Sequence, residues 1–381
     1  TGRSRASPPT ARSRSVDTLG SAPQPRPAPG LDAPPPAAVL TDPDPEPADP
    51  EAGGGGPVPP APGARPCVRC GGAVAADGYC TECGEPAASE RDHWTERPAP
   101  RVAGVCDRGV RHARNEDAMA LAAGDESGDG DRAEGAGRSF AALVVCDGVS
   151  SAPDSDVASL AAARAARDVL AAGGPGGASP VDGETTVRMG TWSAVLGDAV
   201  RAADDAVRAA AGDAVHHENP PSCTVAAAVV DGPLVVTGWV GDSRAYWLPD
   251  VGGAQQLSVD DSWAQEMVDR GVPRAQAEAS PQAHAITRWL GPDAPDPTAR
   301  TAVTLPDGPG WVLVCSDGLW NYCSPADDLA ALVRTTEATA GRDPAALAAA
   351  LVAWANAQGG RDNVTVALAR FTPLEPHPAT R

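Results

Sequence analysis

Apolar runs of strand length recur along the chain from about residue 100 onward. The runs at 141–146 and 311–315 are continuous and short, a pattern typical of strands buried on both faces. Two further strands are predicted at 224–230 and 234–240, joined as a hairpin by an Asp-Gly-Pro turn, and a last one at 364–371. The chain therefore contains several strands that must be covered by other elements.

Longer stretches carry helical periodicity instead. Apolar residues recur at helical spacing in 156–172 and 191–212, and the arginines and aspartates of 191–212 fall on the opposite face. The alanine-rich stretch 344–358 predicts a third helix, which Gly359 and Gly360 end. Because strands and helices come in groups, the pattern predicts an α+β domain of packed sheets flanked by helices.

The chain divides into three parts. Residues 1–66 hold 18 of the 40 prolines and almost no bulky apolar side chains, so we expect a disordered Pro/Ala/Gly-rich arm. A small cysteine-containing module is expected at 67–86, and the main domain at 100–372. Within that domain the acidic, glycine-rich stretch 124–138 is predicted to be a surface loop.

Four of the nine cysteines form two CxxC pairs nine residues apart, Cys67/Cys70 and Cys80/Cys83, each followed by glycine. This spacing is typical of the two knuckles of a zinc ribbon. Four thiolates would leave no open position on Zn²⁺, so the predicted role is structural or adaptor-like; redox or disulfide pairing is the alternative. The remaining cysteines are expected to be reduced core residues: Cys106, Cys146, Cys223, Cys315 and Cys323.

The charge balance limits the classes of partner. The 381 residues include 30 basic ones, all arginine, and 50 acidic ones, for a net charge of −20. Binding to a phosphate backbone depends on clustered cations, so nucleic acid is not expected as a partner, and basic protein segments are weakly favoured. No run approaches the roughly 20 apolar residues that span a bilayer, so we expect no membrane association and a cytoplasmic location.

Several aspartates follow the predicted strands directly, which would converge their carboxylates on one site. They lie in five short motifs: Arg114-Asn115-Glu116-Asp117, Asp147-Gly148, Gly241-Asp242-Ser243-Arg244, Ser316-Asp317-Gly318 and Arg361-Asp362-Asn363. Carboxylates gathered without lysines repel one another unless a hard divalent cation binds them. Two such ions about 3.5–4 Å apart can clamp an in-line displacement at phosphorus, which predicts a metal-dependent phosphatase. By contrast, Asp231-Gly232 and Asp307-Gly308 are interpreted as turns.

With their connecting residues, these motifs make the chain similar to a known family. Gly241 to Tyr246, Cys315 to Trp320 and Gly360 to Thr365 resemble the PPM/PP2C metal-dependent serine/threonine phosphatases in their bacterial form, over about 100–372. The resemblance implies an α-β-β-α sandwich with the metals in a cleft at one end of the sheets. It also implies that 251–300 contains a variable flap bordering the substrate cleft.

The resemblance implies roles for individual residues. Asp147 would bridge two Mn²⁺ or Mg²⁺ ions, the Gly148 carbonyl would bind the first ion, and Asp317 and Asp362 would complete the second. Glu116 and Asp117 would support the second ion, and Asp242 with Asp317 would hold a possible third. A water between the two main ions would become a hydroxide near neutral pH and attack phosphorus without a covalent phospho-enzyme.

One position departs from the family pattern. The usual phosphate-holding arginine stands five residues before Asp117, where this chain has His112, with Arg111 and Arg114 close by. Histidine cannot offer the bidentate fork of a guanidinium. Either a neighbouring arginine binds the phosphate or binding is weak; alternatively, His112 donates a proton to the leaving alkoxide. Arg244, Arg361 and Asn363 are expected to brace their loops.

Three functions follow from these residues. The first is a protein serine/threonine phosphatase that opposes bacterial Ser/Thr kinases by acting on the kinases and their targets, with the ribbon or arm available for protein docking. The second is a pseudophosphatase scaffold that binds phosphoproteins, which His112 favours and the retained Asp147, Asp317 and Asp362 oppose. The third is a zinc-dependent adaptor, for which the net charge and absence of basic clusters argue against nucleic acid.

Overall fold

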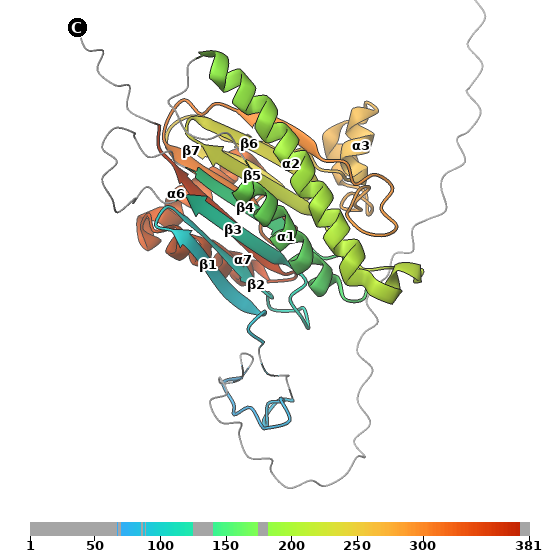
Figure 1. Cartoon of the computed structure of the whole chain (residues 1–381). Helices are drawn as coiled ribbons and strands as arrows, with labels where there is room; N and C mark the ends of the chain where they lie inside the picture. Colours follow the sequence, from blue (N-terminus) through green and yellow to red (C-terminus); the bar gives the residue numbers. More distant parts are fainter. Residues whose placement is uncertain are drawn as a thin grey trace, which may run out of the picture. The chain divides into compact units, whose positions relative to one another are not determined.

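Two antiparallel sheets pack face to face in the computed structural model, with helices on both outer faces (Figure 1). The structure describes residues 67, 70–84, 87, 89–124, 140–173 and 182–373. The arm expected at 1–66 and nearly all of the loop expected at 124–138 lie outside these ranges. The predicted α-β-β-α sandwich is confirmed.

The described part of the chain forms a six-stranded sheet of order β1-β2-β11-β10-β7-β8 and a five-stranded sheet of order β3-β4-β5-β6-β9. The first sheet consists of β1 (His93–Ala99), β2 (Val102–Asp107), β11 (Val364–Phe371), β10 (Gly310–Cys315), β7 (Arg244–Pro249) and β8 (Gln255–Gln256). The second consists of β3 (Ala118–Gly124), β4 (Phe140–Cys146), β5 (Val225–Asp231), β6 (Leu234–Val240) and β9 (Arg300–Thr304).

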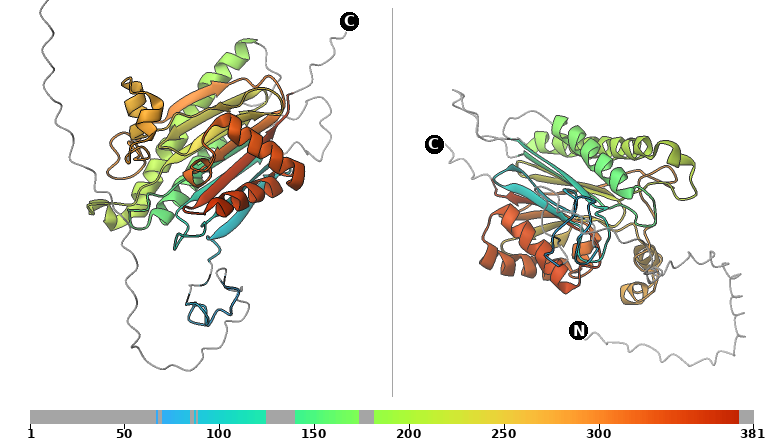
Figure 2. Two further views of the ribbon diagram at one scale, coloured as in Figure 1. Left: turned by 180° about the vertical axis from the view of Figure 1, so that it is seen from behind. Right: turned by 90° about the horizontal axis from the view of Figure 1, so that it is seen from below.

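Each sheet is covered by its own pair of helices, as Figure 2 shows from two sides. Helices α1 (Ser155–Ala172) and α2 (Asp182–Ala211) pack on the five-stranded sheet, and α6 (Ala326–Ala340) and α7 (Pro344–Gln358) pack on the six-stranded one. A third apolar layer lies between the sheets. The short elements are η1 (Gly212–His216), α3 (Trp263–Asp269), α4 (Arg274–Glu278) and α5 (Asp317–Trp320).

Local signals determine α7 most clearly. The Asp343 carboxylate accepts hydrogen bonds from Ala345 N and Ala346 N, Pro344 occupies the first helical position, and Gly359 ends the helix with φ 144°. These are the cap residues that helix termini favour. No helix in the described ranges is long and apolar enough to cross a lipid bilayer.

The structure corrects several boundaries and roles. The sheet begins with β1 at His93, upstream of the boundary expected at residue 100, and α2 begins at Asp182 rather than 191. Asp231 does precede a turn at Gly232, but its carboxylate is also fully buried and paired with Arg188 at 2.5 Å. Cys323 is only partly buried and follows α5, whereas the other four scattered cysteines are buried in or beside strands.

Candidate metal centre

The candidate acids lie at one end of both sheets. In the five-stranded sheet, Ala118 pairs with Cys146, and Val225 pairs with Val240 at the same end. In the six-stranded sheet, Cys315 pairs with both Arg244 and Val366. The acids stand within two residues of these strand ends: Asp117, Asp147, Asp242, Asp317 and Asp362.

Asp117 joins the ends of the two sheets. It precedes β3, and its Oδ2 accepts hydrogen bonds from Ser316 Oγ and Thr365 Oγ1 of the other sheet, both at 2.7 Å. Its side chain is fully buried, and Oδ1 has no hydrogen-bond partner. Asp147 lies beside it, and its carboxyl can donate a hydrogen bond to Asp117 only while Asp147 holds a proton. A buried anionic oxygen without a donor is suited to a cation.

Burial and mutual repulsion raise the pKa values of these acids. Burial raises the pKa of Asp117 to about 7, and the negative charge of Asp362 adds to the rise, whereas hydrogen bonds from Ser316 and Thr365 oppose it. Burial, followed by the charges of Asp117, Asp317 and Asp362, raises the pKa of Asp147 well above its usual range. Protons or cations must therefore relieve this concentration of negative charge.

The pKa values of Asp317 and Asp242 are also raised. Burial first, and then the charges of Asp362, Asp242 and Asp117, raise the pKa of Asp317 well above its usual range. Burial and the charge of Asp260 raise the pKa of Asp242 to about 7, against the opposing effect of Arg244. Four of the predicted ligands are thus destabilised as anions in the absence of a cation.

Two glycines allow the backbone to pack closely around these acids. A Cβ on Gly148 would stand 2.7 Å from the Glu116 carbonyl oxygen, and a Cβ on Gly318 would stand 1.9 Å from the Asn363 carbonyl oxygen. Real Cβ atoms do not approach backbone this closely, so any larger residue would push the loops that carry Asp147 and Asp317 away from their neighbours.

Asn363 braces the loop of Glu116 and Asp117. Its Oδ1 accepts a hydrogen bond from Glu116 N at 2.7 Å, and its Nδ2 donates to the carbonyl oxygens of Arg108 at 2.7 Å and Arg114 at 3.1 Å. The amide therefore holds together segments about 250 residues apart in the sequence. The predicted role was to brace its own Asp362 loop, whereas in the structure the Asn363 side chain braces the Glu116–Asp117 segment.

The candidate phosphate-binding residues differ in their availability. Arg114 is engaged with Glu116, with Nη2 2.6 Å from Oε1. His112 Nε2 lies 3.3 Å from Asp362 Oδ1, which places this histidine at the acidic cluster. The Arg111 side chain is exposed, while its backbone N–H donates to the Gly360 carbonyl. Arg111 is therefore the neighbouring arginine whose side chain is free to move toward a ligand.

Arg244 fixes the Asp242 loop to the region expected as a flap. Its guanidinium binds Asp260, with Nη2 2.6 Å from Oδ2, and lies 3.6 Å from the centroid of the Trp320 ring. Trp320 Nε1 in turn donates to the Asp242 carbonyl oxygen. A pocket of about 180 Å³ begins here, lined by Arg244, Asp260, Gln265, Arg274, His284 and Asn321 among others.

The carboxylates are more widely spread than the cysteines. Among the described residues, only the four CxxC cysteines bring three or more candidate ligand atoms within 4.8 Å of one another. The difference has a physical reason, because ionised carboxylates without a cation repel one another and a two-ion site divides its ligands between two centres. The structure brings the predicted acids to one end of the sandwich without closing them into a single compact ligand set.

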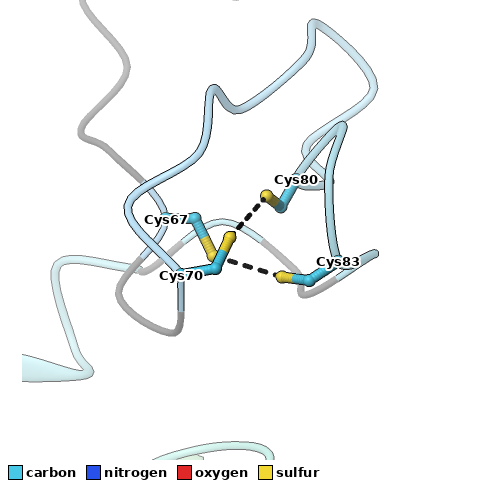
Figure 3. Close-up of side chains that lie close together, drawn as sticks. All are labelled: Cys67, Cys70, Cys80 and Cys83. Carbon is cyan, nitrogen blue, oxygen red and sulfur yellow. Dashed lines mark hydrogen bonds between the residues drawn. The ribbon is translucent and has the colours of Figure 1, made fainter.

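The four cysteines form the compact cluster shown in Figure 3. Cys67 Sγ lies 3.6 Å from Cys83 Sγ, and Cys70 Sγ lies 3.5 Å from Cys80 Sγ. A tetrahedral Zn²⁺ with Zn–S bonds of about 2.3 Å separates its sulfurs by about 3.8 Å, so the cluster fits a zinc-ribbon-like module. Backbone hydrogen bonds from Cys83 and Glu82 lower the pKa of Cys80 to about 7, which favours its thiolate. The pKa of Cys70 instead rises to about 12, because hydrogen bonds with Cys83 and Cys80 outweigh the lowering effect of the Gly72 N–H.

Replacing one of these cysteines is expected to remove the zinc. We expect the wild-type protein to contain about one zinc per chain and Cys67→Ser to contain almost none, because structural Zn²⁺ requires its full set of four ligands. Elemental analysis of the purified proteins measures this. Cys323→Ser removes a thiol outside the cluster and is the matched control; equal zinc content in Cys67→Ser and wild type would contradict the assignment.

The sequence analysis named Asn363 and Arg244 as loop braces, but it missed three further side chains that hold the acids in place. Ser316 and Thr365 lie inside motifs that were recognised by their aspartates, yet both donate to Asp117. Arg91 also contacts this loop from a segment without a recognisable motif. A hydroxyl next to a motif aspartate is a weak signal, and no local pattern identifies Arg91.

A family comparison identifies the same region. The model of the family described as Protein phosphatase 2C matches residues 118–355, which is more than half of the chain. Asp147, Gly148, Asp242 and Asp317 lie inside the match, whereas Asp362 lies just beyond it. No curated protein matches the sequence.

Solved structures of bacterial phosphatases share the fold. The serine/threonine phosphatase PstP/Ppp of Mycobacterium tuberculosis is 27% identical with a TM-score of 0.54, and the alignment covers 71% of this chain and 98% of that one. The S. agalactiae serine/threonine phosphatase is 22% identical (TM-score 0.54; 73% and 100% covered), and Stp1 of Staphylococcus aureus is 20% identical (TM-score 0.53; 72% and 95%). The last two support the fold alone.

Proposed function

The chain belongs to the protein phosphatase 2C family, and from that premise we propose that it hydrolyses phosphoserine and phosphothreonine in proteins with Mn²⁺ or Mg²⁺. The observation that carries the proposal is the acid cluster at the sheet ends, in which buried Asp117 Oδ1 lacks a partner, and burial followed by neighbouring charges raises the pKa of Asp147 and Asp317. Such a cluster is costly to a scaffold and useful to a cation-dependent enzyme.

The residues present suit hard divalent cations, because they offer carboxylate and carbonyl oxygens. Asp147, the Gly148 carbonyl, Asp317 and Asp362 would hold two ions, Glu116 and Asp117 would support them, and Asp242 with Asp317 would hold a third. When bound, the cations supply the Lewis acidity that activates water and stabilises charge on the phosphoryl group.

The chain's own residues would orient the substrate around this centre. Arg111, exposed and near the cluster, would contact phosphate oxygens, and His112, next to Asp362, would hold a proton for the leaving alkoxide. Arg114 would act through Glu116, to which it is bound. The pocket beside Asn321 would receive a substrate residue near the phosphorylated one, because Asn321 Nδ2 also donates to Asp317 Oδ2.

The biological setting belongs to the same proposal. The substrates would be phosphorylated Ser/Thr kinases and their targets in the cytoplasm. The strongly acidic net charge suits basic protein segments. A zinc-loaded Cys67–Cys83 module would provide a docking surface for proteins rather than a catalytic site, because four thiolates leave zinc no open position.

The test is phosphate release from a phosphothreonine peptide by the purified protein, measured with added Mn²⁺ and with a chelator. We expect release that depends on Mn²⁺ and stops on chelation. Because a guanidinium offers a bidentate contact that imidazole lacks, His112→Arg is expected to lower KM for the peptide about tenfold. Peptide binding without release at any Mn²⁺ concentration would instead support the pseudophosphatase scaffold.

A further inference from the structure

Arg91 contacts the main chain of the segment that carries Asp117. Its Nη2 donates to the carbonyl oxygens of Asn115 at 3.3 Å and Asp117 at 3.1 Å. The contact is reciprocal, because Asn115 Nδ2 donates to the Arg91 carbonyl oxygen at 2.9 Å. A single residue thus makes three hydrogen bonds to a stretch of three residues.

Arg91 is itself held in place by its neighbours. Its backbone N–H donates to Ser89 Oγ at 3.0 Å, and Ser89 N donates to Asp92 Oδ2 at 2.7 Å. The Asp92 carbonyl accepts a hydrogen bond from Arg108 N, which ties this turn to the end of β2. The guanidinium also lies over Trp94, 5.4 Å from the ring centroid. The turn fixes the Arg91 backbone, and the Trp94 ring restricts the rotamers of its long side chain, which lowers the entropic cost of its hydrogen bonds.

The Asn115–Asp117 segment is consequently held by contacts from two parts of the chain. Asn363 accepts from Glu116 N, and Arg91 binds the carbonyls of the residues before and after Glu116. Asn363 belongs to a motif next to a predicted ligand. Arg91 lies upstream of the family match at 118–355, in the segment leading into β1.

We propose that Arg91 is a positioning residue for the metal centre, which fixes the backbone of Asn115–Asp117 so that the Asp117 carboxylate points at the other acids. The proposal rests on the proposed function. The guanidinium brings a positive charge close to the acid cluster and binds carbonyl oxygens, so it leaves the carboxylate oxygens available to cations. It does not touch the substrate.

The experiment compares Mn²⁺ affinity among variants by the electron paramagnetic resonance signal of free Mn²⁺. We expect Arg91→Ala to bind Mn²⁺ about tenfold more weakly than wild type, the size of effect typical when a residue supporting a metal ligand is lost. Arg91→Lys should be intermediate, because an ammonium retains the charge but lacks the planar fork.

The matched control is Arg101→Ala. Arg101 Nη2 also donates to a backbone carbonyl, that of Phe140, which begins β4 at the end opposite Asp147. Its Mn²⁺ affinity should equal that of wild type. An equal loss in Arg101→Ala would indicate general weakening of the sandwich and would overturn the proposal.

A second readout does not depend on metal or activity. Hydrogen exchange of the Glu116 and Asp117 amides in the metal-free protein should be about tenfold faster in Arg91→Ala than in wild type. Without the guanidinium as donor to the Asn115 and Asp117 carbonyl oxygens, the segment should open more often. Unchanged exchange and unchanged Mn²⁺ affinity would overturn the proposal.

If Arg91→Ala fails to fold, Arg91→Lys decides by the same measurements. A wild type that binds no Mn²⁺ overturns the proposed function, while exchange still tests whether Arg91 holds the segment.

Discussion

Asp147→Asn is expected to reduce Mn²⁺-dependent phosphate release from a phosphothreonine peptide by about a thousandfold or more. The residue directly follows β4, and its carboxylate interacts with those of Asp117, Asp317 and Asp362. Removing the charge from the predicted bridging ligand weakens the binding of both cations, and metal-dependent stabilisation of the transition state is worth several kcal/mol. Initial rates at saturating peptide over a range of Mn²⁺ concentrations measure the effect.

The same substitution should leave the fold intact. Asparagine has nearly the same shape as aspartate, and its neutrality relieves repulsion among the buried acids, so the metal-free variant should unfold at a temperature no lower than wild type. Asp198→Asn removes an exposed acid paired with Arg201 on α2 and serves as the control for loss of charge. Full activity in Asp147→Asn at saturating Mn²⁺ would place the metal centre elsewhere.

The metal-free protein is expected to lose stability as pH rises from about 4 to 7. The pKa values of Asp117 and Asp242 are each raised to about 7 from an ordinary 3.8. The folded state therefore holds more protons than the unfolded state within this window. The free energy of unfolding falls as these protons are lost, by up to about 1.4 kcal/mol per pH unit for each such carboxyl.

Mn²⁺ should reverse this dependence, because the cation replaces the protons and binds the ionised carboxylates more tightly as pH rises. Urea unfolding at several pH values, with a chelator and with Mn²⁺, measures both trends. Asp117→Asn should flatten the chelator curve, whereas Asp198→Asn should leave its slope unchanged. A chelator curve that rises with pH between 4 and 7 would show that the acids are stabilised as anions without metal.

Sequence alone determined the elements whose signals are local. Helix α7 was predicted at 344–358, where the structure places it, because its start and end are set by residues adjacent to it. Strands β4 and β10 were predicted from continuous apolar runs, which correspond to their almost complete burial. Strand β6 was predicted as part of a hairpin, and β11 as the strand that follows the end of a helix. The order of the aspartate motifs relative to these strands was enough to place the acids at strand ends.

Elements whose stability comes from distant contacts were missed or given the wrong start: β1 was not predicted, and α2 was expected to begin at residue 191. The sequence of β1 has no apolar run, and most of its residues are exposed or partly exposed; it is a strand because it pairs with β2. The first turns of α2 contain two glycines and several threonines, which are weak helix formers. Arg188 in this part binds the buried Asp231, so a tertiary contact supports a helix that local propensity does not predict.

The residue types of the candidate site, and their positions next to strands, were available from the sequence. The hydrogen bonds that hold Asp117 in place were decided only by the tertiary structure. Asp117 is fixed by Ser316 and Thr365, which lie 199 and 248 residues away in the sequence. Its main-chain carbonyl is fixed by Arg91, which lies 26 residues away. Hydrogen bonds of this kind leave no periodicity in a sequence, because they depend on how the two sheets bring their strand ends together.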